Sequence, residues 1–452
     1  MCNLFLVRVG LSISLGFAAF TSPAFANGDI LYVGAGHPYG TIGSAVSAAS
    51  TGDLILVEQG TYPPFEVAGV NADKDLVILA RQMGPGIPMP EVQSYPGSPA
   101  VYVDDVPAGG QLTLRGLHFK RADANTRVAV LSESEGEIWV EGCVFGTESD
   151  YNYFYTFGKP TLSSNLNESL HVIDCKLYGV NGTEQFEVES RYGSEAVSAT
   201  DSNLSMWNSL LVGGNGGNGK YDPHGDIIVH PKDGSPAMVQ VRQYGMSPVG
   251  LFFSGCTLRG GDGGDGDGVN GVGCVGGADG AYALVLESVN QAYSLDSIFE
   301  AGEGGAGFVG TPGCGSGMTP LTAIQLILSN LDFLAGPSRT ATSVSTIVDG
   351  TAFELTTFGI SGPNVRFLFS QTNPDYSFFL NRLGVLCVDP NWGQMVTGIF
   401  TGTPGANGSL SFTIPFSPIL PGLGVDSASI WIQPVEIPTG NLGAPTCVSI
   451  VI

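Results

Sequence analysis

The chain has 452 residues, of which 41 are acidic and 17 are basic, so its formal net charge at neutral pH is −24. A surface this acidic repels nucleic acids and anionic polymers unless cations intervene, and we expect no nucleic-acid partner. Only 13 % of the residues are charged, whereas 66 are glycine. This composition is typical of a β-rich solenoid or sandwich and not of a helical or disordered protein.

The first 26 residues are predicted to be a secretory signal peptide. The positive charge of Arg8 precedes an apolar run at 9–20, and the small residues Ala24 and Ala26 mark a cleavage site before Asn27. This run is shorter than the ~20 residues that cross a bilayer, and no later segment is apolar enough to do so. We therefore expect an exported protein, secreted or at the cell surface, without a membrane span. Seven cysteines remain after cleavage, which fits an oxidising compartment.

A helix, a turn and a strand are predicted in residues 41–62. Apolar spacing indicates a helix at Ile42–Ala49, a turn at Gly52-Asp53, a strand at Leu54–Val57 and a second turn at Gly60. This order resembles the entrance to right-handed parallel β-helices of the pectin-lyase type. The resemblance covers residues 28–335 at the level of strands and turns, not of catalytic motifs. It implies that the helix caps the N-terminal end of a solenoid and that the Gly-Asp turn starts the first rung.

One phrase recurs along this region without a fixed period. It reads apolar-x-apolar-x-[Gly/Asp/Asn]-[Cys/Ser/Leu]-x-apolar, and it starts at residues 112, 138, 170, 204, 251 and 293. Each copy predicts a strand, a bend whose Gly, Asp or Asn tolerates positive φ, and the start of a second strand. Residues in excess of a bare rung must leave the stack as loops on one side.

The repeat places Cys143, Cys175 and Cys256 in one register. Stacked positions lie within disulfide distance, so a Cys143–Cys175 bond is one interpretation. The other is a ladder of small buried side chains, because a free cysteine behaves as a small hydrophobic residue. We favour the ladder.

Three glycine-rich segments follow the repeated phrase at the same place, at 213–219, 260–268 and 302–317. We expect them to project from one edge of the solenoid as a flexible acidic fringe. Cys274 and Cys314 lie in such loops, where packing does not explain them, and we predict a disulfide between them. Asp262, Asp265 and Asp267 form the best candidate for a calcium site, since calcium prefers several oxygen ligands; a solvated loop is the alternative.

Two further groups are candidates for binding or chemistry. Tyr151, Tyr153 and Tyr155 belong to an aromatic run that either stacks on sugar rings or plugs an inserted loop. The second group contains His224, Asp226 and His230. If residues 226–230 form a strand, Asp226 and His230 share a face and are suited to a metal or to general acid–base chemistry. A surface loop crossing onto a rung is the alternative.

The pattern changes near residue 341. Short alternating strands separated by Pro, Gly and Asn turns predict a small antiparallel β-sandwich, like the sandwich appended to many exported bacterial β-helix proteins. The fold class is therefore all-β: a signal peptide at 1–26, a right-handed parallel β-helix with an N-terminal capping helix at 27–340, and a β-sandwich at 341–452. We expect a Cys387–Cys447 disulfide in the sandwich, which is also suited to covering the open end of the solenoid.

The favoured function is an exported interaction protein that binds polysaccharide or another cell-surface component through its side loops. The alternative is a polysaccharide-active enzyme, a lyase first, with calcium held by the three aspartates and Arg259 near the position of the base. A passive structural component of the envelope is the third possibility. Fold resemblance does not choose among these functions.

Overall fold

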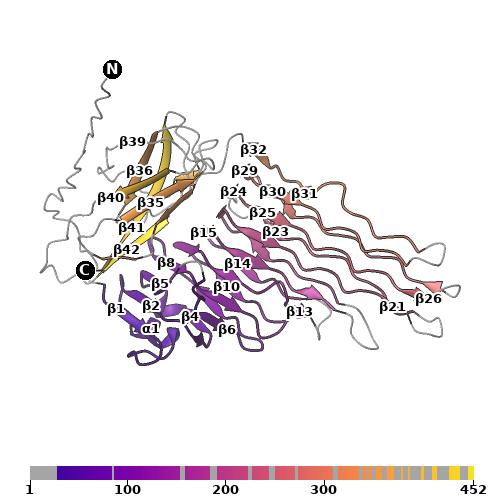
Figure 1. The fold of residues 1–452 in the computed structure, drawn as a ribbon, viewed down its shortest axis with the longest axis horizontal. Helices are drawn as coiled ribbons and strands as arrows, with labels where there is room; N and C mark the ends of the chain where they lie inside the picture. Colours follow the sequence, from indigo (N-terminus) through magenta and orange to yellow (C-terminus); the bar gives the residue numbers. More distant parts are fainter. Residues whose placement is uncertain are drawn as a thin grey trace, which may run out of the picture.

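Three long parallel sheets form the main body of the protein (Figure 1). The structure, a computed structural model, describes residues 28–83, 86–152, 158–183, 191–221, 227–243, 250–269, 273–308 and 314–334, and then ten strands between 340 and 451. Every strand pair in the three sheets is parallel. This topology is consistent with the expected β-helical solenoid, in which each rung contributes one strand to each sheet.

The ten-stranded sheet contains, in order, β1 (Ile30–Val33), β2 (Leu54–Val57), β5 (Leu76–Ala80), β8 (Gln111–Arg115), β11 (Glu137–Glu141), β15 (Ser169–Ile173), β19 (Leu204–Trp207), β24 (Gly250–Ser254), β29 (Gln291–Leu295) and β32 (Asp332–Leu334). An eight-stranded sheet contains β4 (Phe65–Val67), β7 (Val101–Asp104), β10 (Ala129–Ser132), β14 (Leu162–Asn165), β18 (Val197–Thr200), β23 (Met238–Val241), β28 (Leu284–Glu287) and β31 (Ile324–Ile327). The third sheet contains β3 (Thr61–Tyr62), β6 (Glu91–Gln93), β9 (His118–Lys120), β12 (Val144–Phe145), β16 (Lys176–Tyr178), β20 (Leu210–Val212), β25 (Thr257–Arg259) and β30 (Ile298–Glu300).

The single α-helix of the described residues is α1 (Ile42–Ala48), one residue shorter than predicted. Thr41 caps it, because its hydroxyl accepts a hydrogen bond from the Ser44 N–H at 3.2 Å. Its buried face contains Ile42, Ala45 and Val46, and it contacts β1, β2 and β4. A short 3₁₀ helix, η1 (Gly69–Asn71), follows β4.

The repeated phrase marks strands in register, as predicted, in five of its six copies. Residues 112, 138, 170, 204 and 251 pair in sequence along the ten-stranded sheet and point into the core. The sixth copy is shifted by one residue, because Leu251 pairs with Ala292 and not with Tyr293. The prediction for Tyr293 was therefore wrong: a slip of one residue moves a side chain to the opposite face of a sheet.

The bend of each copy has the predicted left-handed backbone. The φ angles are +69° at Gly116, +59° at Gly142, +64° at Gly255, and +52°, +46° and +49° at Asp174, Asn208 and Asp296. The next position lies inside the corner, where Cys143, Cys175 and Cys256 are buried and unpaired. The ladder interpretation of these cysteines is thus confirmed.

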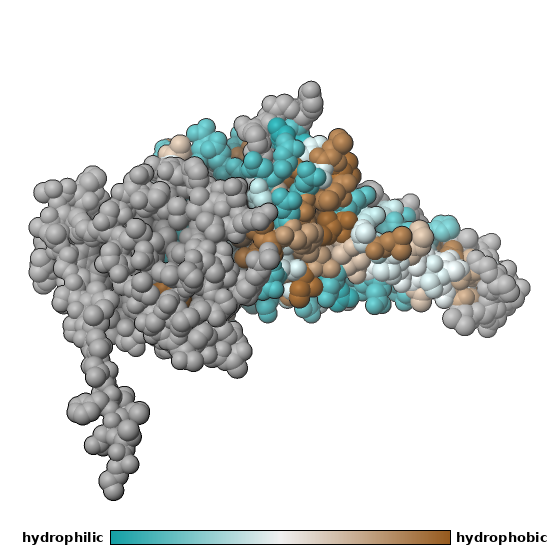
Figure 2. All heavy atoms as spheres, turned by 90° about the horizontal axis from the view of Figure 1, so that it is seen from above, coloured by the Kyte–Doolittle hydropathy of each residue, from teal (hydrophilic) through white to brown (hydrophobic). Residues whose placement is uncertain are grey.

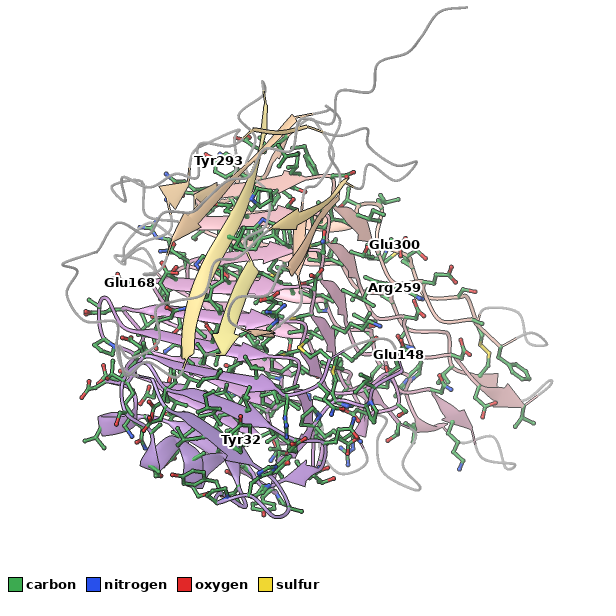
Figure 3. All side chains as sticks on the ribbon, turned by 60° about the vertical axis from the view of Figure 1, so that its left-hand side comes forward. Tyr32, Glu148, Glu168, Arg259, Tyr293 and Glu300 are labelled. Atoms are coloured by element: carbon green, nitrogen blue, oxygen red, sulfur yellow. A yellow bond between two sulfur atoms is a disulfide. The ribbon has the colours of Figure 1, made fainter. Side chains whose placement is uncertain are left out.

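The C-terminal strands form separate sheets, and all their pairs except β34–β42 are antiparallel. One sheet contains β33 (Thr340–Ser343), β35 (Phe353–Phe358) and β40 (Leu410–Ile414). A second contains β34 (Thr346–Val348), β42 (Thr446–Val451), β41 (Ser427–Ile437), β36 (Asn364–Ser370) and β39 (Ile399–Thr401), and a third pairs β37 (Phe378–Phe379) with β38 (Val385–Leu386). Figures 1 and 3 place β41 and β42 beside the ten-stranded sheet and not over its β32 end.

The outer face of the ten-stranded sheet is also buried at β11 and β15. His171 Nε2 lies 3.2 Å from a Glu137 carboxylate oxygen and 2.9 Å from the Ser169 hydroxyl, and the Trp139 ring stacks on the imidazole at 4.0 Å. Serine and glutamate contact the same ring nitrogen, so this is not a serine–histidine–acid relay, which uses both nitrogens. Since the His171 side chain is 1 % exposed, the cluster contributes to packing and is not accessible to a substrate.

Within the described part of the chain, no helix has the length and apolarity needed to cross a membrane.

Candidate functional site

The glycine-rich segments leave the solenoid at one edge and return to it (Figure 1). Four outgoing segments follow strands of the third sheet: residues 179–183 after β16, 213–219 after β20, 260–268 after β25 and 301–308 after β30. Four returning segments lead into β18, β23, β28 and β31: residues 191–196, 230–237, 275–283 and 314–323. We call these eight segments the glycine array. Their projection from a common edge was predicted; their internal order was not.

Short strand pairs lie near the far end of the array. They are β13 (Tyr151–Asn152) with β17 (Asn181–Gly182), β21 (Lys220–Tyr221) with β22 (Ile227–Val229), and β26 (Gly268–Val269) with β27 (Gly273–Cys274). A disulfide joins Cys274 and Cys314, whose Cα atoms are 6.0 Å apart. This confirms the predicted bond and ties β27, directly before the returning segment 275–283, to the returning segment 314–323.

Backbone hydrogen bonds connect neighbouring segments every third residue. The N–H groups of Gly213, Gly216 and Gly219 donate to the carbonyl oxygens of Arg259, Asp262 and Asp265 at 2.7–2.8 Å. A β-strand would pair with a period of two residues, whereas a period of three is that of the polyproline II conformation. The array is therefore a stack of extended threefold segments, and the expectation of a flexible fringe was wrong.

A second set of bonds joins the outgoing layer to the returning layer. Gly214 and Gly217 donate to the carbonyl oxygens of Ser194 and Arg191, both at 2.9 Å. The two layers are close enough for backbone-to-backbone contact, so a Cβ atom at Gly216 would overlap the Lys232 carbonyl group of the returning layer. Glycine is required here by close approach and not by a positive φ.

Asparagine and aspartate side chains extend this network on the outer face of the outgoing segments. The Asn181 amide oxygen accepts the Asn215 N–H, Asn215 accepts the Asp262 N–H, and Asp262 accepts the Glu303 N–H, all at 2.8–2.9 Å. A parallel series runs from Asn218 to Asp265 at 2.8 Å and from Asp265 to the Ala306 N–H at 2.7 Å. We call Asn181, Asn215, Asn218, Asp262 and Asp265 the polar ladder.

The returning segments have a shorter series of the same kind. The Asp233 carboxylate accepts the Asp279 N–H at 2.9 Å, and Asp279 accepts the Met318 N–H at 2.7 Å. On this side the Lys232 ammonium lies 4.9 Å from the centre of the Tyr192 ring, which is cation–π distance.

The three predicted calcium ligands each make a hydrogen bond to a different backbone N–H group. Asp262 and Asp265 each accept a backbone N–H from the next outgoing segment, and Asp267 accepts the Gly268 N–H at 2.8 Å. Among the described residues, no three His, Cys, Asp or Glu side chains form a group suited to a metal. The structure does not bring the three aspartates together as one ligand set.

Arg259 is half exposed and pairs with Asp262, 3.2 Å from its carboxylate. Figure 3 shows Arg259 and Glu300, with Glu148, along the edge from which the outgoing segments leave. The Cα atoms of Arg259 and Glu300 are register partners in β25 and β30. The ion pair joins the end of β25 to the start of the outgoing segment that follows it.

The other predicted site residues are only partly described. His230 is exposed at the start of a returning segment, whereas His224 and Asp226 lie outside the described residues. The backbone of Tyr151 is in β13; Tyr153 and Tyr155 lie outside. Cys447 is in β42 and Cys387 lies outside, so the bond between them stays a prediction.

Sequence reasoning missed the asparagines of the polar ladder. The signal was present, because Gly-Gly-Asn and Gly-Gly-Asp recur with a period of three in 213–218 and 260–265. That period distinguishes a threefold extended segment from an unstructured glycine loop.

The chain matches no protein-family model, no curated protein and no solved structure.

Proposed function

We propose that this protein is exported and that it binds a neutral polysaccharide, or another uncharged polymer of the cell envelope, through the polar ladder. The observation that carries this proposal is the fixed spacing of amide and carboxylate side chains on one face of the glycine array. Asn215, Asn218 and Asp265 are exposed there, and each is held by a hydrogen bond to the neighbouring segment.

Three physical properties of the ladder support such a partner. A face whose backbone is already ordered loses little conformational entropy when it binds. Its amide and carboxylate groups are acceptors for the hydroxyl groups of a sugar chain. The net charge of −24 opposes anionic polymers, which favours an uncharged partner.

We also propose the finer features of the fold that the sequence predicts. Residues 1–26 are a signal peptide, and the Cys274–Cys314 disulfide fits the oxidising compartment that export implies. The buried face of α1 supports a capping role at the start of a right-handed β-helix of the pectin-lyase superfamily. The C-terminal sheets form a β-sandwich.

Binding to insoluble and soluble polysaccharides tests the function. Glu303→Arg with Ala306→Arg places two long side chains over the ladder at exposed positions whose backbone bonds are unaffected. We expect this variant to bind a neutral polysaccharide about tenfold more weakly, which is ~1.4 kcal/mol. The control is Val70→Arg, at a position that is 80 % exposed and lies in η1.

A second variant tests whether binding depends on the hydrogen-bond acceptors of the polar ladder or on its negative charge. Asp262→Asn with Asp265→Asn keeps the acceptors of the ladder, since Asn215 and Asn218 fill the same roles in the preceding segment. It should bind the neutral polymer as the wild type does. Absence of binding by the wild type, or equal binding by the double arginine variant, would contradict the proposal.

A further inference from the structure

The end of the solenoid opposite α1 exposes a cluster of large apolar side chains. Seven of the ten exposed large hydrophobic residues found in the described chain lie between residues 298 and 333: Ile298, Met318, Leu321, Leu326, Ile327, Leu328 and Phe333. Figure 2, which views the molecule from above, shows apolar residues gathered on this side. An apolar patch of this kind marks an interaction site.

The hydrophobic core continues into this patch. Phe253 packs edge-on against Phe299, with ring centres 5.8 Å apart, and Phe299 packs edge-on against Phe333 at 6.2 Å. Phe253 is fully buried whereas Phe333 is 66 % exposed, so the column of rings ends at the surface. Strands β30, β31 and β32 are the last strands of the three long sheets in the described chain. Terminal strands present backbone groups that favour association with another chain.

We propose that a second copy of this chain binds this end, so that two solenoids meet end to end about a twofold axis. Met318, Leu321, Leu326, Leu328 and Phe333 together expose on the order of 700 Å² if a large apolar residue has about 200 Å². That area is close to the ~800 Å² per partner of a standard interface.

The structure of the α1 end of the solenoid favours a contact between two identical ends over head-to-tail stacking. Head-to-tail stacking would need a complementary apolar surface at the first rung, but there α1 packs on β1, β2 and β4 with Ile42, Ala45 and Val46 buried. A contact between identical ends closes at two copies, whereas a head-to-tail contact would continue as a filament.

The mass of the mature full-length protein in solution tests this proposal, and the measurement needs no polysaccharide. We expect light scattering or sedimentation to give twice the chain mass at micromolar concentration. Leu321→Glu with Leu328→Asn should raise the dissociation constant at least about tenfold. Leu321 is 103 % exposed, and Leu328 has φ of +51°, where asparagine is tolerated better than leucine, so neither change should unfold the chain.

Val70→Glu is the matched control, because Val70 is equally accessible but lies near α1. This variant should keep the doubled mass. A single-chain mass for the wild type over the whole concentration range would overturn the proposal. A doubled mass for the Leu321→Glu, Leu328→Asn variant, with an unchanged circular dichroism spectrum, would overturn it as well.

Discussion

Glycine residues have two different roles in this protein. At the rung corners Gly142 and its equivalents have positive φ, and Asp174, Asn208 and Asp296 fill the same position elsewhere. Asparagine and aspartate tolerate this conformation, so the corner does not require glycine. In the glycine array the requirement is space, because neighbouring backbones occupy the volume of a side chain.

This distinction leads to a prediction for two alanine substitutions. Gly214→Ala should lower the free energy of unfolding by about 1–3 kcal/mol or more, because its Cβ meets the Val180 carbonyl group. Gly315→Ala should change it by less than about 0.5 kcal/mol, because a Cβ there has no atom within 4 Å. Chemical denaturation of both variants measures the difference. Equal stability of the two would contradict the close packing of the array.

At the scale of elements, the glycine array is held by backbone bonds, side-chain ladders and one disulfide. The ladder changes at the last outgoing segment, where Glu303 and Ala306 occupy the positions of Asn215 and Asn218. Ala306 has no side-chain acceptor to offer to a further segment. The series of side-chain hydrogen bonds that runs through Asn218 and Asp265 therefore ends at Ala306, in the last outgoing segment.

Loss of the disulfide should loosen the array locally. Cys274→Ser with Cys314→Ser opens a link across 40 residues, and we expect a loss of about 2–4 kcal/mol with faster proteolysis between residues 260 and 320. Limited proteolysis followed by mass spectrometry measures this. Cys256→Ser is the control, since Ser209 and Ser297 occupy the same corner register and Ser297 accepts the Cys256 N–H at 3.1 Å. Cleavage concentrated elsewhere would contradict the role of the bond.

At the scale of the whole molecule, carboxyl groups that lose hydration on folding make stability depend on pH. Loss of hydration raises the pKa of Asp75 above its usual 3.8 and that of Glu195 above its usual 4.5. The folded protein therefore binds protons at these carboxyls more readily than the unfolded chain does. Their contribution to stability falls as pH rises through the raised values and is regained on acidification.

This pH dependence can be tested by comparing the melting temperatures of variants with that of the wild type. Asp75→Asn keeps an acceptor for the Gln111 N–H, which Asp75 binds at 2.9 Å, and it removes the titration. Its melting temperature should rise less than that of the wild type as the pH falls from neutral toward the usual aspartate value of 3.8. Glu58 titrates in the opposite sense, because Arg81 lowers its pKa below the usual 4.5. Its contribution to stability is lost only as the pH falls below 4.5, and there Glu58→Gln should lose less stability than the wild type. Identical pH profiles of Asp75→Asn and the wild type would contradict the assignment.

Local patterns in the sequence determined the strands, the corners and the cysteine ladder. Alternation assigns faces within one strand, and a bend residue such as Asp174 reports its own backbone, so neither depends on distant contacts. The predicted register of Tyr293 was wrong, because alternation alone does not show which residue of a strand pairs with its neighbour. Tertiary structure alone decided which segments lie side by side and that Asp262 and Asp265 accept backbone N–H groups from the next outgoing segment. Those bonds join residues about 40 positions apart on neighbouring rungs, so they depend on the alignment of the segments by the solenoid.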